Sequence, residues 1–352
     1  MPFLSCLALF STAFVSTFGL SFLAHRFFPR WGLMDRPERY GHDRAPIPYP
    51  GGVAVVLGIL FTVLHFLPLS PSVLAVLLAT LLLAITCFWD DRRGLSPYLR
   101  FAIQIVAALL LVLGGLGVSS ITNPFGPEPL LLDVWEFPVT LGQLTFTFTI
   151  LADLLTVAWV VAMVNAFNWI DGVPGMASGV SSVASFVLLV LSMRPGFHSV
   201  DQTLAVAFSA ILFGASLAFL YWDFPKPKML LGDTGSMVLG FLLAVTAFIS
   251  GGKIATTFLV LSFPFFDFVW VLLRRLFKGQ SPFKGDLWHL HHRLQKAGYS
   301  DRGIVLFYTL SSALFGSLAL LLHTEGKLLA LILVLGFMLL LMLLLYSKKP
   351  AS

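Results

Sequence analysis

The sequence predicts an all-α polytopic integral membrane protein with about eleven transmembrane helices. Of its 352 residues, 58% are hydrophobic and only 11% are charged, and runs of roughly 18 or more apolar residues are typical of membrane spans. No polar stretch is long enough to fold alone, so we expect a single transmembrane domain over residues 1–352 and no nucleic-acid partner. The expected spans are 3–24, 51–67, 72–89, 99–118, 152–170, 177–193, 201–221, 236–250, 254–274, 303–322 and 327–346.

The distribution of basic residues predicts the orientation. If the N-terminus lies outside, 19 of the 22 Lys and Arg residues fall in inner loops, and only Arg194, Lys253 and Lys327 fall outside. Loops rich in Lys and Arg stay in the cytoplasm. We therefore expect the N-terminus outside, the C-terminus in the cytoplasm, and an odd number of spans.

The segments on the outer side are expected to be structural. The apolar N-terminus lacks a basic leading region, which favours a retained span over a removed signal. The connection 119–151 has no Lys or Arg, and residues 145–150 (TFTFTI) alternate with period two. Residues 130–135 could pair with them, so we predict a small β-hairpin on the outer face. Asp153 is interpreted as a border residue. Cys6 and Cys87 lie in apolar runs and are expected to be buried thiols.

Two adjacent carboxylates, Asp90 and Asp91, end the apolar run that begins at Val73. Neighbouring negative charges raise each other's proton affinity unless a cation neutralises them. The pair either marks a membrane border or belongs to a site that handles metal or phosphate.

Two further inner loops carry candidate ligands. Arg44 stands in HDRAPIPYPGG (42–52), which is either a stiff linker or a ligand-contacting loop, because its prolines prevent a helix and its glycines allow close approach. Asn165, Asn168 and Asp171 step by three and share one helical face. They either face a wet cavity or clamp neighbouring helices together.

The remaining inner loops add an acid and a histidine cluster. Asp233 stands in GDTGS (232–236) before an apolar helix. A helix N-terminus favours phosphate, and a carboxylate there can hold Mg²⁺, although a plain turn has the same residues. The segment HLHHRL (289–294) has three His and one Arg without a Cys, which suits phosphate or sugar binding beside Mg²⁺ better than zinc. Asp267 either pairs with Arg274 or shares a cavity.

These loops together resemble glycosyl transferase family 4, the bacterial polyprenyl-phosphate N-acetylhexosamine-1-phosphate transferases, which are related to the enzyme that makes the first lipid-linked peptidoglycan precursor. The resemblance covers about residues 42–294. The matching pieces are Asp90-Asp91 with Leu95-Ser96, Asn165-Ala166-Phe167-Asn168 with Asp171-Gly172, Gly232-Asp233-Thr234-Gly235-Ser236, and His289-Leu290-His291-His292-Arg293-Leu294.

The resemblance implies the reaction and its participants. A polyprenyl phosphate in the bacterial inner membrane attacks the β-phosphate of a UDP-N-acetylhexosamine on the cytoplasmic side, UMP leaves, and Mg²⁺ or Mn²⁺ is required. A homodimer is a further family expectation. The expected catalytic residues are Asp90, Asp91 and Asp171. The expected metal ligands are Asp233 and Asp91. The expected substrate-binding residues are Arg44, Asn165, Asn168, Lys228, His289, His291, His292 and Arg293.

Two departures from the family pattern concern the nucleotide. The family usually has Asp-Gly-x-Asp-Gly, whereas Pro174 replaces the second acid here, and Asp223 stands where Asn is more usual. Two other functions compete with the enzyme. A transporter would show internal repeats and polar residues near mid-membrane, but no repeat is evident. A catalytically silent scaffold is disfavoured by the intact acids, although Pro174 is compatible with it.

Overall fold

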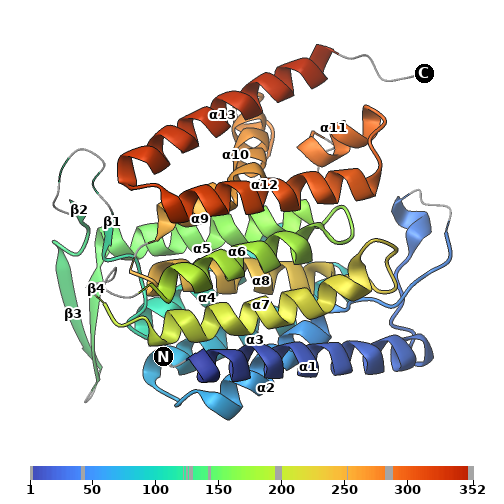
Figure 1. Cartoon of the computed structure of the whole chain (residues 1–352). Helices are drawn as coiled ribbons and strands as arrows, with labels where there is room; N and C mark the ends of the chain where they lie inside the picture. Colours follow the sequence, from blue (N-terminus) through green and yellow to red (C-terminus); the bar gives the residue numbers. More distant parts are fainter. Residues whose placement is uncertain are drawn as a thin grey trace.

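The computed structural model describes residues 3–40, 44–121, 123, 126, 130–141, 144–194, 200–251, 253–281 and 288–347. Helices dominate, as predicted, and they lie roughly side by side in one bundle (Figure 1). The short strands lie at one end of the bundle, and the short helix α11 (Leu290–Lys296) lies at the other. His42 and Asp43, from the first inner loop, lie outside the described residues.

Each predicted span contains a helix, but the helices differ in length. Within the described ranges, seven helices are long and apolar enough to cross a membrane, and a bent pair makes up to eight. The seven are α1 (Phe3–Phe27), α3 (Pro71–Arg93), α5 (Ile150–Ile170), α7 (Thr203–Asp223), α8 (Gly232–Ile249), α12 (Asp301–Leu321) and α13 (Thr324–Ser347). Three shorter apolar helices are α2 (Gly52–Phe66), α4 (Pro97–Leu113) and α6 (Met176–Ser192). Short 3-10 helices, η1 (Phe28–Trp31) and η2 (Pro37–Tyr40), follow α1.

The span predicted at 254–274 is not one straight helix. It consists of α9 (Ile254–Val260) and α10 (Ser262–Phe277), which meet at an angle of 89°. A helix that continued past Val260 would need an N–H at position 264 to bond to the Val260 carbonyl, and Pro264 has none. Pro264 is a sequence signal for this bend, and the prediction of one span from the apolar run did not use it.

The ends of α4 also differ from the predicted 99–118. Ser96 accepts a hydrogen bond from the Leu99 N–H at 3.2 Å, with Pro97 in the first helical position, so the helix starts two residues earlier. It ends at Leu113, before two consecutive glycines.

The alternating segment 145–150 forms a strand over most of its length, but its predicted partner was wrong. β4 (Leu144–Thr149) pairs with β3 (Glu136–Leu141) in antiparallel register, with Phe137 opposite Phe148. Residues 130–131 instead form β2 (Leu130–Leu131), which pairs with β1 (Ser120–Ile121). Only two residues separate β3 from β4 in the sequence, and such short connections favour pairing between neighbours.

Helix α8 is the centre of the bundle. It packs against α2, α3, α5, α6 and α7, and 89% of its residues are buried inside the bundle. Small residues permit this close packing: a Cβ added to Gly52 would lie 2.1 Å from the backbone nitrogen of Gly235. The N-terminus of α8, with Asp233 in its first turn, is therefore held in the middle of the end of the bundle where α11 lies.

Candidate active site

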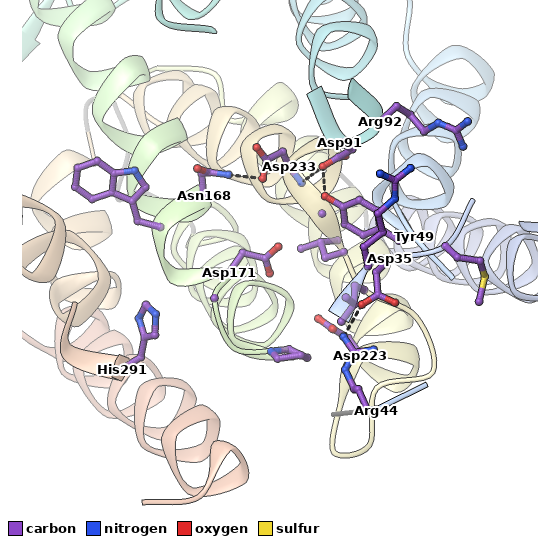
Figure 2. A pocket seen from close by; sticks show the side chains of 18 of the residues that line it. Asp35, Arg44, Tyr49, Asp91, Arg92, Asn168, Asp171, Asp223, Asp233 and His291 are labelled. Atoms are coloured by element: carbon purple, nitrogen blue, oxygen red, sulfur yellow. Dashed lines mark hydrogen bonds and ion pairs between the residues drawn. The ribbon is translucent and has the colours of Figure 1, made fainter. Parts of the chain in front are cut away.

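A cavity of about 910 Å³ lies at this end of the bundle. Its walls come from seven parts of the chain: the loops before α2, the end of α3, the start of α4, the end of α5 with the turn to α6, the end of α7, the start of α8 with the residues before it, and α11. Figure 2 shows Asp91, Asn168, Asp171, Asp233 and His291 arranged around it. Segments far apart in the sequence thus form one site.

Asp91 caps the start of α8. Its carboxylate accepts hydrogen bonds from the Asp233 N–H at 2.9 Å, the Thr234 N–H at 3.0 Å and the Thr234 hydroxyl at 2.5 Å. The Tyr49 hydroxyl donates a further hydrogen bond to it. The first N–H groups of a helix have no partner within the helix, and a negative charge stabilises that end. Asp91 therefore fixes where α8 begins.

Gly232 allows the backbone to make this turn. Its φ of 77° lies in the left-handed region that favours glycine. A Cβ there would lie 2.8 Å from the Pro50 Cβ and 3.1 Å from the Asp91 Oδ2. A glycine is therefore required before Asp233, because the backbone there has a positive φ and because a Cβ would be too close to neighbouring atoms.

Arg100 bridges two carboxylates from different helices. Its Nη1 lies 2.9 Å from Asp90 Oδ2 and 3.0 Å from Asp233 Oδ2. The other Asp90 oxygen accepts from the Leu95 N–H at 2.5 Å, and the other Asp233 oxygen accepts from the Asn168 amide at 2.8 Å. Both oxygens of Asp233 are therefore held in place by cavity-lining donors.

Asp171 and Asp223 add two acids to the same cavity. Asp171 follows α5, and its pKa is raised well above the usual range, first by burial and then by the negative charges of Asp223, Asp233 and Asp91. Asp223 is 1% exposed, and the Ser178 hydroxyl donates to its Oδ2 at 2.9 Å. Its Oδ1 has no hydrogen-bond partner among the described residues.

The histidines fall into two groups. His289 turns its Nδ1 toward Asp267 Oδ2 at 3.1 Å, and the other Asp267 oxygen accepts from the Leu290 N–H at 2.8 Å. His291 and His292 line the cavity. The pKa of each is lowered, first by burial, and that of His291 lies well below its usual value. Neither ring nitrogen of His291 has a hydrogen-bond partner in the described part of the chain, so this neutral ring is free to bind a ligand.

The structure brings most of the predicted site residues together. Seven of them line the cavity: Arg44, Asp91, Asn168, Asp171, Asp233, His291 and His292. Arg44 pairs there with Asp35, whose Oδ2 lies 2.6 Å from its Nη2.

Five predicted site residues are not among the described residues that line this cavity: Asp90, Asn165, Lys228, His289 and Arg293. Asp90 contacts Arg100, which does line the cavity, and His289 contacts Asp267, which is not among the described lining residues. The Asn165 amide donates to Gln104 Oε1 at 2.6 Å, which is the interhelical clamp that the sequence left open. The Lys228 ammonium lies 3.5 Å from the centre of the Tyr221 ring, and the Arg293 guanidinium lies 5.4 Å from that of Trp288.

Sequence reasoning missed other cavity residues, and it missed the partner of Asp267. Arg100 was used only as one of the basic residues that predict the orientation in the membrane, although it lies near Asp90 in the sequence. Tyr49 was within the quoted loop, but nothing marked its contact with Asp91. Asp267 contacts His289, whereas Arg274 packs 3.9 Å from the centre of the Trp288 ring. The remaining missed residues of the cavity wall include Asp35, Arg36, Arg92, Trp169 and Gln295.

The donor atoms of the cavity fit a hard cation bound together with phosphate. Among the described residues, no three His, Cys, Asp or Glu side chains converge as a preformed metal site. Mg²⁺ needs fewer, since it usually takes one or two carboxylates and completes its octahedral shell with phosphate oxygens and water. The crowding of negative charge around Asp171 and Asp233 favours a bound cation.

An integral membrane protein with carboxylates, guanidinium groups and neutral imidazoles in one cavity is suited to phosphate-bearing substrates at the membrane border. Comparison with known proteins agrees. The sequence profile of glycosyl transferase family 4 matches residues 73–251, and the chain belongs to this family of membrane enzymes.

Several known proteins are similar to this chain over most of their length. The chain is 30% identical over 327 residues to the undecaprenyl-phosphate alpha-N-acetylglucosaminyl 1-phosphate transferase of Escherichia coli (strain K12), covering 89% of this chain and 81% of the relative. It is 29% identical over 301 residues to the probable undecaprenyl-phosphate N-acetylglucosaminyl 1-phosphate transferase of Bacillus subtilis (strain 168), covering 83% and 78%. It is 31% identical over 306 residues to the decaprenyl-phosphate N-acetylglucosaminephosphotransferase of Mycobacterium tuberculosis (strain ATCC 25618 / H37Rv), covering 79% and 72%.

Proposed function

We propose that this protein transfers N-acetylglucosamine-1-phosphate from UDP-N-acetylglucosamine to polyprenyl phosphate and releases UMP, in the first membrane step of cell-envelope glycan synthesis. The names of the relatives support the acceptor and the transferred group. The observation that carries the proposal is Asp233, held at the N-terminus of the central helix between Arg100 and Asn168 and open to the cavity.

The reaction depends more on aligning the carrier phosphate with the UDP-sugar than on a base that removes a proton. An oxygen of the carrier phosphate attacks the β-phosphorus of the UDP-sugar, and the bond from that phosphorus to the bridging oxygen breaks, so UMP leaves with that oxygen. A phosphate monoester has a second pKa near 6 and is mostly ionised at neutral pH. Phosphoryl transfer then depends on positioning and on neutralising charge. Arg100 provides a cation at the attacking phosphate, and Asp90 positions the Arg100 side chain.

Mg²⁺ is the metal that this donor set favours, and Mn²⁺ fits the same hard oxygens. Asp233 would hold it, with Asp91 or Asp171 as a second ligand. Of these two, Asp171 has the freer carboxylate, because Asp91 already accepts four hydrogen bonds at the start of α8. A bound Mg²⁺ would neutralise the negative charge of the diphosphate.

The other cavity residues bind different parts of the UDP-sugar. Asn168, Asp171 and the partly unpaired Asp223 bind the nucleotide end, where Asp223 offers a buried oxygen without a partner. His291 and His292 contact the diphosphate and the sugar. His289, which Asp267 holds in place, stacks on the His291 ring with their centroids 5.6 Å apart and positions it, while Arg293 packs against Trp288 outside the cavity lining.

The cavity faces the cytoplasm of a bacterial inner membrane in this proposal, and the chain crosses that membrane eleven times. The split of basic residues supports the orientation. We would place single cysteines at Lys296, on α11, and at Trp135, beside the strands, in a background without Cys6 and Cys87. Intact cells should leave position 296 unlabelled by a membrane-impermeant maleimide and label position 135, and the reverse pattern would contradict the orientation.

The function is tested by UMP release from detergent-solubilised protein with polyprenyl phosphate and a panel of UDP-sugars. We expect Mg²⁺-dependent release with UDP-N-acetylglucosamine and none without the carrier. Absence of release with every sugar and either metal would favour the catalytically silent scaffold. Transport of a substrate without UMP release would favour the transporter. The homodimer stays a prediction, which light scattering of the purified protein tests.

A further inference from the structure

The segment 46–51 (PIPYPG) before α2 alternates proline with residues that carry a backbone N–H. Proline has no N–H to donate, so only every second residue can hold this segment in place through its own N–H. The Tyr49 N–H donates to the Leu33 carbonyl at 3.0 Å, and the Gly51 N–H donates to the Leu230 carbonyl at 2.7 Å. The segment is therefore fixed between the chain that follows η1 and the chain that precedes α8, where Tyr49 lines the cavity.

The remaining donor of this segment, the Ile47 N–H, is bonded to a side chain. Its acceptor is Asp35 Oδ1 at 2.7 Å, and the Asp35 N–H in turn donates to the Ile47 carbonyl at 3.0 Å. Asp35 is thus paired with Ile47 through both its carboxylate and its backbone. The residue is only 6% exposed, so its carboxylate is fixed within the cavity wall rather than in solvent.

The other oxygen of Asp35 holds Arg44. Asp35 Oδ2 lies 2.6 Å from Arg44 Nη2, and Arg44 Nη1 donates to the Ala45 carbonyl at 3.1 Å. A guanidinium has five N–H donors in one plane, and these contacts use two of them. The Arg44 side chain is 33% exposed and lines the cavity, so its other N–H groups can bind a ligand. Because the long side chain is already fixed at two points, it loses less conformational entropy when the ligand binds.

The place of this pair in the cavity indicates which substrate Arg44 binds. Figure 2 shows Asp35 and Arg44 across the cavity from His291 and on the same side as Asp223. In the proposed function, Asp223 belongs to the nucleotide end of the UDP-sugar, and Arg100 is the cation for the carrier phosphate. A guanidinium on the nucleotide side matches the phosphate oxygens of the UDP-sugar, with which it forms charge-assisted hydrogen bonds.

We propose that Asp35 is a positioning residue, which holds the Arg44 guanidinium where it binds a phosphate of the UDP-sugar. Asp35 itself takes no part in the chemical step. The identity of the ligand rests on the proposed function, whereas the contacts of Asp35 with Ile47 and Arg44 do not. Loss of the Asp35 charge should therefore weaken binding of the UDP-sugar and leave the transfer step nearly unchanged.

Asp35→Asn separates the two contacts of the Asp35 carboxylate. The Asn amide oxygen can still accept from the Ile47 N–H, whereas its NH₂ group faces the Arg44 guanidinium and cannot accept from it. The companion variants are Arg44→Gln and the double variant with both changes. The matched control is Glu38→Gln, which removes one negative charge from an exposed residue in the same connection.

The measurements are UMP release, which gives kcat and the KM for each substrate, and calorimetry, which gives the Kd of UDP-N-acetylglucosamine for the full-length protein in detergent. We expect Asp35→Asn to raise this Kd and the KM for UDP-N-acetylglucosamine about tenfold, as the loss of one charge-assisted hydrogen bond implies. The kcat and the KM for polyprenyl phosphate should stay nearly unchanged. Arg44→Gln should have the same effect, and the double variant should be no worse than either single variant, because both changes remove the same interaction. Glu38→Gln should match the unmodified protein.

Three outcomes would overturn this role of Asp35. The first is a lower kcat in Asp35→Asn with an unchanged KM for UDP-N-acetylglucosamine. The second is an additive loss of binding in the double variant, which a purely structural residue independent of Arg44 would give. The third is a higher KM for polyprenyl phosphate alone, which would place Arg44 at the carrier phosphate. If Asp35→Asn does not fold, Asp35→Glu, which keeps the charge but displaces it by one methylene, is compared with Arg44→Gln in the same way.

This inference and the proposed function can fail separately. UMP release with an unchanged KM in Asp35→Asn would refute the role of Asp35 and leave the proposed function intact. Binding of UDP-N-acetylglucosamine without UMP release would refute the proposed function, and the Kd values of the variants would still decide whether Asp35 acts through Arg44.

Discussion

Replacing Asp233 by Asn tests the centre of the proposed mechanism, because it removes a charge while it nearly preserves the shape of the side chain. In the structure, one carboxylate oxygen lies 3.0 Å from Arg100 and the other 2.8 Å from the Asn168 amide. Asn keeps one acceptor oxygen but presents an NH₂ group where the second oxygen was. The variant therefore loses a charge-assisted contact and an oxygen ligand for Mg²⁺ together.

The expected loss can be estimated from these contacts. Removing a single preorganised group that stabilises charge in the transition state costs about 10²–10³ in kcat, or roughly 3–4 kcal/mol. We expect UMP release by Asp233→Asn to fall at least about a hundredfold, with a weakened dependence on Mg²⁺ concentration. The fold should persist, since the change removes one negative charge from a group that includes Asp91 and Asp171.

Asp153→Asn is the matched control at the opposite end of the bundle. Asp153 accepts hydrogen bonds from the Thr149 N–H at 2.8 Å and the Thr149 hydroxyl at 3.2 Å, which stabilises the start of α5. Asn retains an acceptor there, so activity should stay within a few-fold of the unmodified protein. UMP release by both variants, measured against Mg²⁺ concentration, tests whether Asp233 is a Mg²⁺ ligand. An unchanged Mg²⁺ curve for Asp233→Asn would refute the metal assignment, and an inactive Asp153→Asn would place the chemistry at the wrong end.

Three further predictions concern the cation, the packing and the pH dependence. Arg100→Gln should lower kcat by about a hundredfold, because the two carboxylates that Arg100 bridges lose their cation. Arg100→Lys should recover part of this loss in the same UMP-release assay, and equal rates in the two variants would show that the positive charge has no role. Gly52→Ala should lower the free energy of unfolding by about 1–3 kcal/mol or more, because its Cβ would lie 2.1 Å from the Gly235 nitrogen, whereas Gly19→Ala has nothing within 4 Å of its Cβ and should not destabilise in thermal unfolding. Burial lowers the pKa of His291 in the folded protein, so the contribution of its neutral ring to stability is present above about pH 6.5, the pKa expected in the unfolded chain, and is lost as the pH falls toward the folded pKa. His291→Gln should therefore flatten the fall in unfolding temperature between pH 7 and 5, and a pH profile identical to that of the unmodified protein would show that His291 is not the group responsible.

The sequence by itself determined the kind of protein and most of the chemistry. Long apolar runs predict membrane helices because backbone groups in lipid must bond within their own segment. Asp91, Asp171 and Asp233 could be identified because adjacent like charges favour a cation, a row of polar side chains on one helix face favours a wet cavity, and a carboxylate at a helix N-terminus can hold the Mg²⁺ that accompanies phosphate. The resemblance to glycosyl transferase family 4 rested on these same residues, and the comparisons confirmed it.

Only the tertiary structure decided which of these side chains share the cavity and which support it. Asp90 and Asp91 are neighbours in sequence, but successive residues of a helix point about 100° apart, so Asp91 reaches the start of α8 while Asp90 holds Arg100. Asn168 lies near Asp233, whereas Asn165, one turn earlier on α5, lies beside Gln104. Asp90 and Arg100 are 10 residues apart in the sequence, but the other partners are 61 to 142 residues apart, and local patterns carry no information on contacts that depend on how whole helices pack.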